Sequence, residues 1–211
     1  MMLWGGHEGS LELRKRASGA MALRGRFPYG KPAVLSDGGR TGRPRKEVIA
    51  PGAFAYRVNK PEEDIHFLVG HSYDRPIASR GAGTLALRDT PEALEIEARI
   101  TPEMQAVSWV ADFLAALGAG LIVGLSPGFR IPPKRAVANA ETIEDEGHDP
   151  ANGAHNAIIR TVQAALLYEI SAVTRPAYEE AAIEQVEARS WASLPEAPDQ
   201  GLHRTLNRWR A

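Results

Sequence analysis

The stretch GLSPGF, residues 124–129, carries a serine in the pattern G-x-S-x-G. That pattern is the signature of the nucleophile elbow of α/β-hydrolases, in which a strand leads into the serine and a helix begins immediately after it. The residues LIVGL (121–125) suit a strand, but PGFRIPP (127–133) holds three prolines and one glycine. A regular helix cannot open on such a segment. Ser126 is therefore either a nucleophile outside an α/β-hydrolase sheet or an ordinary turn residue.

The composition of the 211-residue chain indicates one domain, or one domain with tails. The formal net charge of −1 gives no general attraction to nucleic acid or membranes, and the longest apolar run, around 115–125, is broken by glycines. Because there is no cysteine, disulfides, thiolate metal sites and a cysteine nucleophile are excluded. The N-terminus lacks the pattern of a secretory signal, and we expect a soluble intracellular protein.

Short strands separated by turns dominate the sequence, which predicts a β-dominated α+β fold. The expected elements are a hairpin-like pair over 22–34, a strand and short helix over 47–58, two strands over 64–81 turning at Asp74–Pro76, a hairpin over 84–100, a helix over 101–118, a polar loop over 132–156, two strands over 157–173 and a helix over 176–190. The apolar stripe of the helix over 101–118 indicates core packing.

The organisation that we expect has three parts. Residues 1–20 form a flexible leader, or a first strand with a basic end. Residues 21–190 form the folded domain, and residues 191–211, Pro-rich and then basic, form a flexible C-terminal tail.

A serine nucleophile needs a base within hydrogen-bond reach, and the base needs an orienting partner. Six histidines compete for the role of base: His7, His66, His71, His148, His155 and His203. His66 and His71 bracket the strand IHFLVGH and face opposite sides, and His71 stands at its end. From spacing alone, a packed or solvent-facing histidine is the favoured interpretation.

The acidic residues divide into two groups. Glu169 lies in the apolar strand LLYEISAV, where a charge is costly unless it is paired, although an edge strand would let it face water. The run EDEGHD, residues 144–149, with His155 nearby, allows a divalent-metal site. No regular ligand spacing supports such a site, and a flexible solvated loop is the favoured interpretation. We expect neither a metal nor a cofactor.

Several segments have a pattern of their own when they are taken in chain order. They are LRGRFPYGKPAVL (23–35), EVIAPGAF (47–54), FLVGHSYDRPIAS (67–79), TLALRDTPEALEIEARI (84–100), GLIVGLSPGF (120–129) and LYEISAVTRPAY (167–178). Together they resemble the prohead (procapsid) maturation proteases of tailed phages and gene transfer agents, over about residues 22–185. EVIAPGAF is the most specific match.

This resemblance implies a serine endopeptidase whose domain is 21–190. The family is similar to herpesvirus assembly proteases, which implies a small closed β-barrel wrapped by a few helices. By the same resemblance His71 is the base, Ser126 is the nucleophile and Glu169 is the orienting residue. Asp145 and His148 are the alternatives for the orienting role. Backbone N–H groups, together with Arg175 or Arg130, would form the oxyanion hole.

The implied role is cleavage of the major capsid protein or the scaffold, and of the chain itself, inside the immature procapsid in the bacterial cytoplasm. The implied assembly is a dimer or a larger homo-oligomer, without nucleic-acid or membrane partners. Two rival interpretations are a catalytically silent scaffold protein of the same fold and a lipase or esterase. The order His…Ser counts against the second rival.

Overall fold

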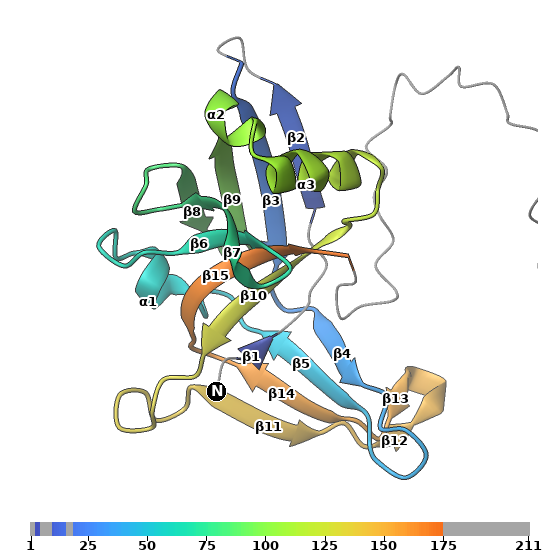
Figure 1. Ribbon diagram of the computed structural model, residues 1–211. Coiled ribbons are helices and arrows are strands. Elements are labelled where there is room, and N and C mark those ends of the chain that lie inside the picture. The colour runs from blue at the N-terminus through green and yellow to red at the C-terminus, as the bar shows by residue number, and fades with distance from the viewer. Residues whose placement is uncertain (1–2, 5–9, 16–18, 175–211) are drawn as a thin grey trace, which may run out of the picture. The chain divides into compact units, whose positions relative to one another are not determined.

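The computed structural model describes residues 3–4, 10–15 and 19–174. Strands dominate this part of the chain, and its helices are few and short (Figure 1). It is the β-dominated α+β fold that the sequence predicts. No helix among these residues is long and apolar enough to cross a membrane.

One sheet of five strands, which we call sheet A, carries Ser126 and Glu169. Its strands follow in the order β1 (Leu3–Trp4), β10 (Gly124–Arg130), β15 (Leu166–Val173), β6 (His66–Val69) and β7 (Ser72–Ser79). β15 is antiparallel to β10 and parallel to β6, so it is a central strand. Its residues are buried or half-buried along the whole strand, so both faces of β15 are covered, which explains why its sequence is almost continuously apolar.

Two further sheets complete the main framework. Sheet B has the order β2 (Ser10–Lys15), β3 (Met21–Pro28), β9 (Ala93–Ile100) and β8 (Leu85–Asp89), and sheet C has the order β11 (Glu141–Asp145), β14 (Ile158–Val162), β5 (Arg45–Ile49) and β4 (Pro32–Ser36). The smaller elements are α1 (Ala55–Val58), α2 (Pro102–Gln105), α3 (Ser108–Gly118), η1 (Pro150–Asn152) and the paired strands β12 (His148–Asp149) and β13 (Ala154–His155).

The helix predicted over 101–118 begins where the sequence indicates but is interrupted once. Thr101 caps α2 by accepting a hydrogen bond from the Met104 N–H, and a proline takes the first helical position. The chain becomes extended at Val107, with ψ of 128°, and then resumes as α3. Phe113 of α3 is buried in the core, so the apolar stripe is core packing, as predicted.

The prediction of a closed β-barrel is wrong for the described residues. Each main sheet ends in two edge strands: β1 and β7 in sheet A, β2 and β8 in sheet B, and β11 and β4 in sheet C. Closure requires the edge strands to hydrogen-bond to one another, whereas sheets A and B meet through side chains. Leu125 of β10 packs directly over Gly25 of β3, where a Cβ would lie only 2.8 Å from the Leu125 Cδ1.

An aromatic cluster joins strand β10 to the EVIAPGAF segment. Phe54, the last residue of that segment, lies with its ring centroid 5.8 Å from that of Phe129 and 6.1 Å from that of Phe27. All three rings are fully buried. At the other end of the segment Glu47 is 1% exposed and accepts a hydrogen bond of 2.9 Å from Arg160. The segment therefore anchors sheet C at one end and supports β10 at the other.

Two sequence-based assignments of local structure are corrected. Residues 22–34 do not form a hairpin, because β3 pairs in sheet B and β4 pairs in sheet C. Residues 132–156 are not a continuous loop, because they contain β11, β12 and β13. β11 is an exposed edge strand whose ends are tied by ion pairs, Glu141 with Arg160 at 2.5 Å and Asp145 with Arg43 at 2.6 Å. Charged edge strands lack the apolar alternation by which strands are predicted.

Some of the other predicted elements are confirmed, and others lie outside the described residues. The hairpin over 84–100 is β8 and β9, and the two strands over 157–173 are β14 and β15. Residues 10–15 form β2, which is the second of the two possibilities that the sequence left open for this segment. The helix over 176–190 and the tail over 191–211 lie outside the described residues. The three-part division of the chain stays a prediction.

Candidate functional site

Ser126 lies inside strand β10, and its side chain is buried. The strand continues through Pro127 to Arg130, so no helix begins immediately after the serine. The α/β-hydrolase elbow is thus absent, as the prolines predicted. Ser171 of β15 stands directly opposite Ser126 in the antiparallel register. Directly opposed residues lie about 5 Å apart at Cα and share one face of the sheet.

His71 occupies the tight turn between β6 and β7. Because Val69 pairs with Ser72, only Gly70 and His71 form the loop, with φ of 59° and 62°. Two-residue hairpin loops favour positive φ, but a histidine in this region stores backbone strain of about 1–3 kcal/mol. Such strain is concentrated at functional sites, where the surroundings hold a side chain in a required direction.

The turn predicted at Asp74–Pro76 is wrong, since these residues belong to β7. The pairing register of β6 and β7 shifts twice, so that Leu68 pairs with Pro76 and Val69 with Ser72. Asp74 therefore lies, exposed, in an irregular part of the strand rather than in the loop. The Asp-Arg-Pro sequence coincides with a local irregularity of the strand, but the chain does not reverse there.

Glu169 lies beside His71, and its side chain is fully buried. Its Oε1 lies 2.9 Å from His71 Nδ1, where the ring N–H donates to the carboxylate. Its Oε2 accepts a 2.6 Å hydrogen bond from the Ser171 hydroxyl. The edge-strand alternative for Glu169 is wrong, because β15 is central. The buried charge is offset by two specific partners, as a buried carboxylate requires.

Ser171 is a member of the site to which the sequence analysis gave no role. Besides donating to Glu169, its Oγ accepts a 3.0 Å hydrogen bond from the His71 backbone N–H. One hydroxyl thus fixes both the carboxylate and the strained turn. The available signal was a serine two residues after the glutamate in an apolar strand, which places both side chains on one face.

Gly128 is the second residue whose function the sequence did not reveal. It stands opposite Glu169, and a Cβ at this position would lie 1.9 Å from the Glu169 Oε1. The glycine therefore leaves the space into which the carboxylate folds to meet His71. In this chain the second glycine of G-x-S-x-G serves the neighbouring strand and not a strand-to-helix turn.

We expect Gly128→Ala to displace the Glu169 carboxylate from His71. The reactivity of Ser126 toward a fluorophosphonate should fall by about 10²-fold, the usual result of misplacing a reacting group by an ångström. Stability should fall by about 1–3 kcal/mol through overpacking. Gly118→Ala is the matched control, because the space around Gly118 is open. Unchanged labelling by Gly128→Ala would show that this packing is irrelevant to the serine.

Aromatic and basic side chains surround this cluster. The Tyr73 ring lies edge-on to the ring of His66, with centroids 5.7 Å apart. Burial raises the pKa of the Tyr73 phenol, and the negative charge of Glu169 adds to the rise. The guanidinium groups of Arg57 and Arg130 lie 4.2 and 5.4 Å from the Tyr168 ring centroid. Arg130 is thus placed on Tyr168 at the end of β10. Arg175, the other oxyanion candidate, lies outside the described residues.

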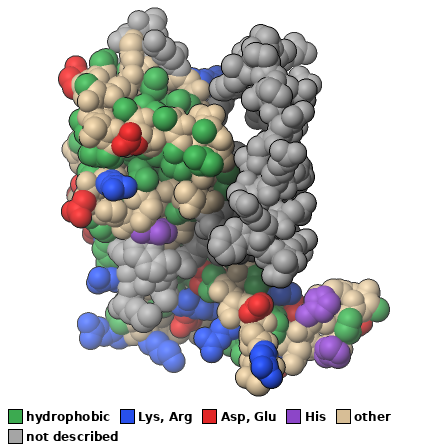
Figure 2. Space-filling model, turned by 45° about the vertical axis from the view of Figure 1, so that its right-hand side comes forward, with side chains coloured by type: hydrophobic (Ala, Val, Ile, Leu, Met, Phe, Trp, Pro, Cys, Tyr) green, Lys and Arg blue, Asp and Glu red, His purple; other side chains and the backbone are tan. Residues whose placement is uncertain are grey.

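The alternative orienting residues lie on other sheets. Asp145 ends β11, where it accepts hydrogen bonds from Arg43 and from the Gly147 N–H. His148 is exposed on β12, paired with β13. Glu146 forms an ion pair with Lys46. The acidic run is thus held by basic side chains, and within the described ranges no group of histidine and acidic side chains could hold a metal ion. Figure 2 shows Lys and Arg side chains gathered on the lower part of the face in view.

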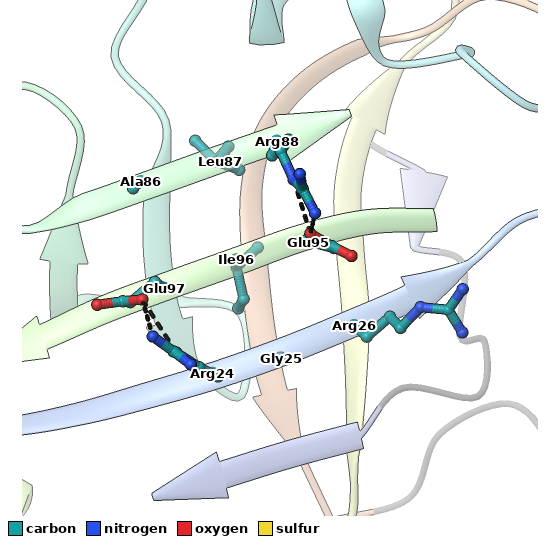
Figure 3. A pocket seen from close by; sticks show the side chains of 9 residues that line it. All are labelled: Arg24, Gly25, Arg26, Ala86, Leu87, Arg88, Glu95, Ile96 and Glu97. Carbon is teal, nitrogen blue, oxygen red and sulfur yellow. Dashed lines mark hydrogen bonds and ion pairs between the residues drawn. The ribbon is translucent and has the colours of Figure 1, made fainter. Parts of the chain in front are cut away.

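A hollow on sheet B is distinct from this cluster. It is lined by residues of β3, β8 and β9 (Figure 3). Its charged side chains pair across neighbouring strands, Arg24 with Glu97 at 2.9 Å and Arg88 with Glu95 at 2.6 Å. These are partly exposed ion pairs of the ordinary surface kind. The hollow contains no serine or histidine, so the candidate site remains on sheet A.

The order and content of the segments can now be compared with known proteins. A family model described as caudovirus prohead serine protease matches residues 36–196. No curated protein and no solved structure matches the chain significantly. The matched range includes His71, Ser126 and Glu169 and covers well over half of the 211 residues. The chain therefore belongs to the caudovirus prohead serine protease family.

Proposed function

We propose that the chain is a serine endopeptidase in which Ser126 is the nucleophile, His71 the base and Glu169 the residue that orients the base. The observation that carries this proposal is the 2.9 Å contact between His71 Nδ1 and the buried Glu169 carboxylate, one strand away from Ser126. Ser126, Gly128, Glu169 and Ser171 share one face of sheet A by their register. Membership of the family supports peptide-bond hydrolysis.

The chemistry follows from this arrangement. With Nδ1–H donating to Glu169, the imidazole is held in the tautomer whose Nε2 carries the lone pair. Nε2 takes the proton of Ser126 as Oγ attacks the carbonyl carbon of the substrate, and the carboxylate stabilises the imidazolium that forms. The same proton passes to the leaving amine when the C–N bond breaks. Water then releases the acyl group from Ser126 by the same steps.

The substrates in this proposal are the major capsid protein or the scaffold, and the chain itself. Cleavage takes place inside the immature procapsid in the bacterial cytoplasm, by a dimer or a larger homo-oligomer. Similarity of fold to the herpesvirus assembly proteases stays a prediction. A silent scaffold protein is the alternative, and a Glu169 carboxylate buried against His71 favours the enzyme, because buried charge without a function is costly.

Co-expression with the major capsid protein of the same particle tests the proposal. Intact-mass spectrometry should find both proteins shortened, and Ser126→Ala should leave both at full length. A catalytically silent scaffold protein would leave both proteins uncut, whether it carries Ser126 or the Ser126→Ala substitution. A lipase or esterase would react with a fluorophosphonate at Ser126 yet leave both proteins whole.

We expect Glu169→Gln to lower the cleavage rate by about 10²–10⁴-fold, because the amide can present its NH₂ to the ring and favour the wrong tautomer. Folding stability should change little, since the replacement keeps the shape and removes a buried charge. The rate of Ser126 acylation and the thermal midpoint measure the two effects. Glu47→Gln is the matched control: it alters another buried glutamate, in sheet C, and should leave acylation unchanged. Wild-type acylation by Glu169→Gln would remove Glu169 from the mechanism.

A further inference from the structure

Strand β15 has one residue more than its partner β10 at the position next to Glu169. Gly128 of β10 pairs with Glu169 and Phe129 pairs with Leu167, so Tyr168 lies between them without a partner on β10. Such a bulge bends the strand and redirects a side chain, and bulges are over-represented next to active sites. Here the redirected side chain is the half-buried ring of Tyr168.

Two guanidinium groups lie against the Tyr168 ring. The guanidinium of Arg57, from α1, is 4.2 Å from the ring centroid, and that of Arg130, from the end of β10, is 5.4 Å from it. Arg57 is 11% exposed and already pairs with Glu63 at 2.9 Å. Arg130 is exposed, and no carboxylate of the described residues lies within ion-pair distance of its guanidinium. Glu63 therefore balances only one of the two positive charges.

Tyr73 adds a hydroxyl group to this region. It follows His71 by two residues, at the start of β7, and is half exposed. Burial raises the pKa of its phenol, the charge of Glu169 raises it further, and the charges of Arg57 and Arg130 oppose the rise. The phenol thus lies within electrostatic range of both the Glu169 carboxylate and the two guanidinium groups. A neutral phenol is a hydrogen-bond donor, so this region offers a cation and a hydroxyl to an anionic group.

The position of Arg130 relative to Ser126 limits what it can bind. Both residues belong to β10, four positions apart. Because a strand rises about 3.3 Å per residue, their Cα atoms are about 13 Å apart, and even spacing puts both side chains on one face. An oxyanion donor must lie about 3 Å from the oxygen that becomes charged. Arg130, held on Tyr168, is better placed for a substrate side chain some residues away from the bond that is cut.

We propose that Arg130, supported by the Tyr168 ring and assisted by the Tyr73 hydroxyl, binds an acidic side chain of the polypeptide substrate, about two to four residues from the bond that is cut. The inference rests on the proposed function of Ser126 and concerns its specificity. A guanidinium offers two parallel N–H donors to a carboxylate, and stacking on a ring fixes its plane before the substrate arrives. A basic substrate side chain at this place would be repelled, which adds to the discrimination.

The test is a cleavage profile of the purified full chain on a peptide library made by digesting bacterial proteins, with the new peptide ends identified by mass spectrometry. For the unaltered chain, Asp and Glu should be enriched about tenfold at one position near the cut, the effect of a charge-assisted hydrogen bond. Arg130→Glu should replace this enrichment by one for Lys and Arg, and Arg130→Lys should keep a weaker acidic preference. Arg99→Glu, which changes an exposed arginine on sheet B, is the matched control and should leave the profile unaltered.

A second measurement covers the case in which Arg130→Glu does not fold. A synthetic peptide with the preferred sequence is compared with the same peptide carrying the amide in place of the acid. For the unaltered chain the amide should raise KM about tenfold with little change in kcat, whereas Arg130→Gln should cleave the two peptides equally well.

The outcomes separate this inference from the proposed function. The absence of an acidic preference in the unaltered chain, or the same acidic preference in Arg130→Glu, would overturn the inference. A fluorophosphonate has no acidic side chain, so it should label Ser126 equally in the unaltered chain and in the Arg130 variants. Failure of labelling in the unaltered chain, or labelling without any peptide cleavage, contradicts the proposed function. Labelling and cleavage without acidic preference contradict only the role of Arg130.

Discussion

Ser126→Ala should reduce the rate of capsid-protein cleavage by about 10⁵-fold or more, because no other group in the cluster can form the acyl intermediate in its place. The single hydroxyl is lost from a buried strand position, so stability should change by no more than about 1 kcal/mol. The cleavage rate of purified protein and its thermal midpoint are the two measurements. A loss of rate without a loss of stability is the signature of a missing nucleophile.

Ser108→Ala is the matched control, since Ser108 is exposed at the start of α3. It should cleave at the unaltered rate. A folded Ser126→Ala protein that still processed the capsid protein near the normal rate would exclude Ser126 as the nucleophile. The presence of the motif residues around Ser126 would then have to be explained by their packing in the fold alone.

His71→Ala should be about as damaging as Ser126→Ala, and the double variant should be no worse than either, since members of one catalytic unit are not additive. The backbone gives a second expectation. At φ of 62° a glycine is unstrained, so His71→Gly should be as inactive as His71→Ala but more stable by about 1–2 kcal/mol. Single-turnover rates and denaturant unfolding of the three proteins measure these effects.

Substitution of His66 or His148 by alanine provides the comparison. The Glu169 carboxylate is held by His71 and Ser171, and His148 lies on β12, apart from sheet A. Both variants should retain most of their activity. If His148→Ala matched Ser126→Ala and His71→Ala did not, the base would be His148.

The sequence predicted the strands that are rich in apolar residues and the polar residues of types that are common in catalytic sites. Helix 101–118 could be predicted because its cap and apolar spacing are local signals. Strand β15 could be predicted from its β-branched and apolar residues, but its central position depends on pairing with β6, about a hundred residues earlier. That long-range partner decides that Glu169 is buried, which is why local alternation could not choose between burial and an edge.

The remaining parts of the site depend on contacts that no local pattern records. The need for Gly128 is created by the carboxylate of another strand, and the reversal at Gly70–His71 competes with a stronger turn signal at Asp74–Pro76. The closed barrel was carried over from a resemblance. Whether neighbouring sheets join by hydrogen bonds or by side chains, as Leu125 and Gly25 do, is a property of the assembled core.

The insertion of β15 between β10 and β6 also determines when, in the proposed mechanism, the site of this chain can be completed. His71 is made 98 residues before Glu169, and strand β10 is made between them. On the ribosome, the proposed base and the proposed nucleophile therefore emerge while the strand that joins them does not yet exist. Contacts so distant in sequence form late in folding. In the proposed mechanism, synthesis itself would thus delay proteolysis until the chain has been completed beyond Val173.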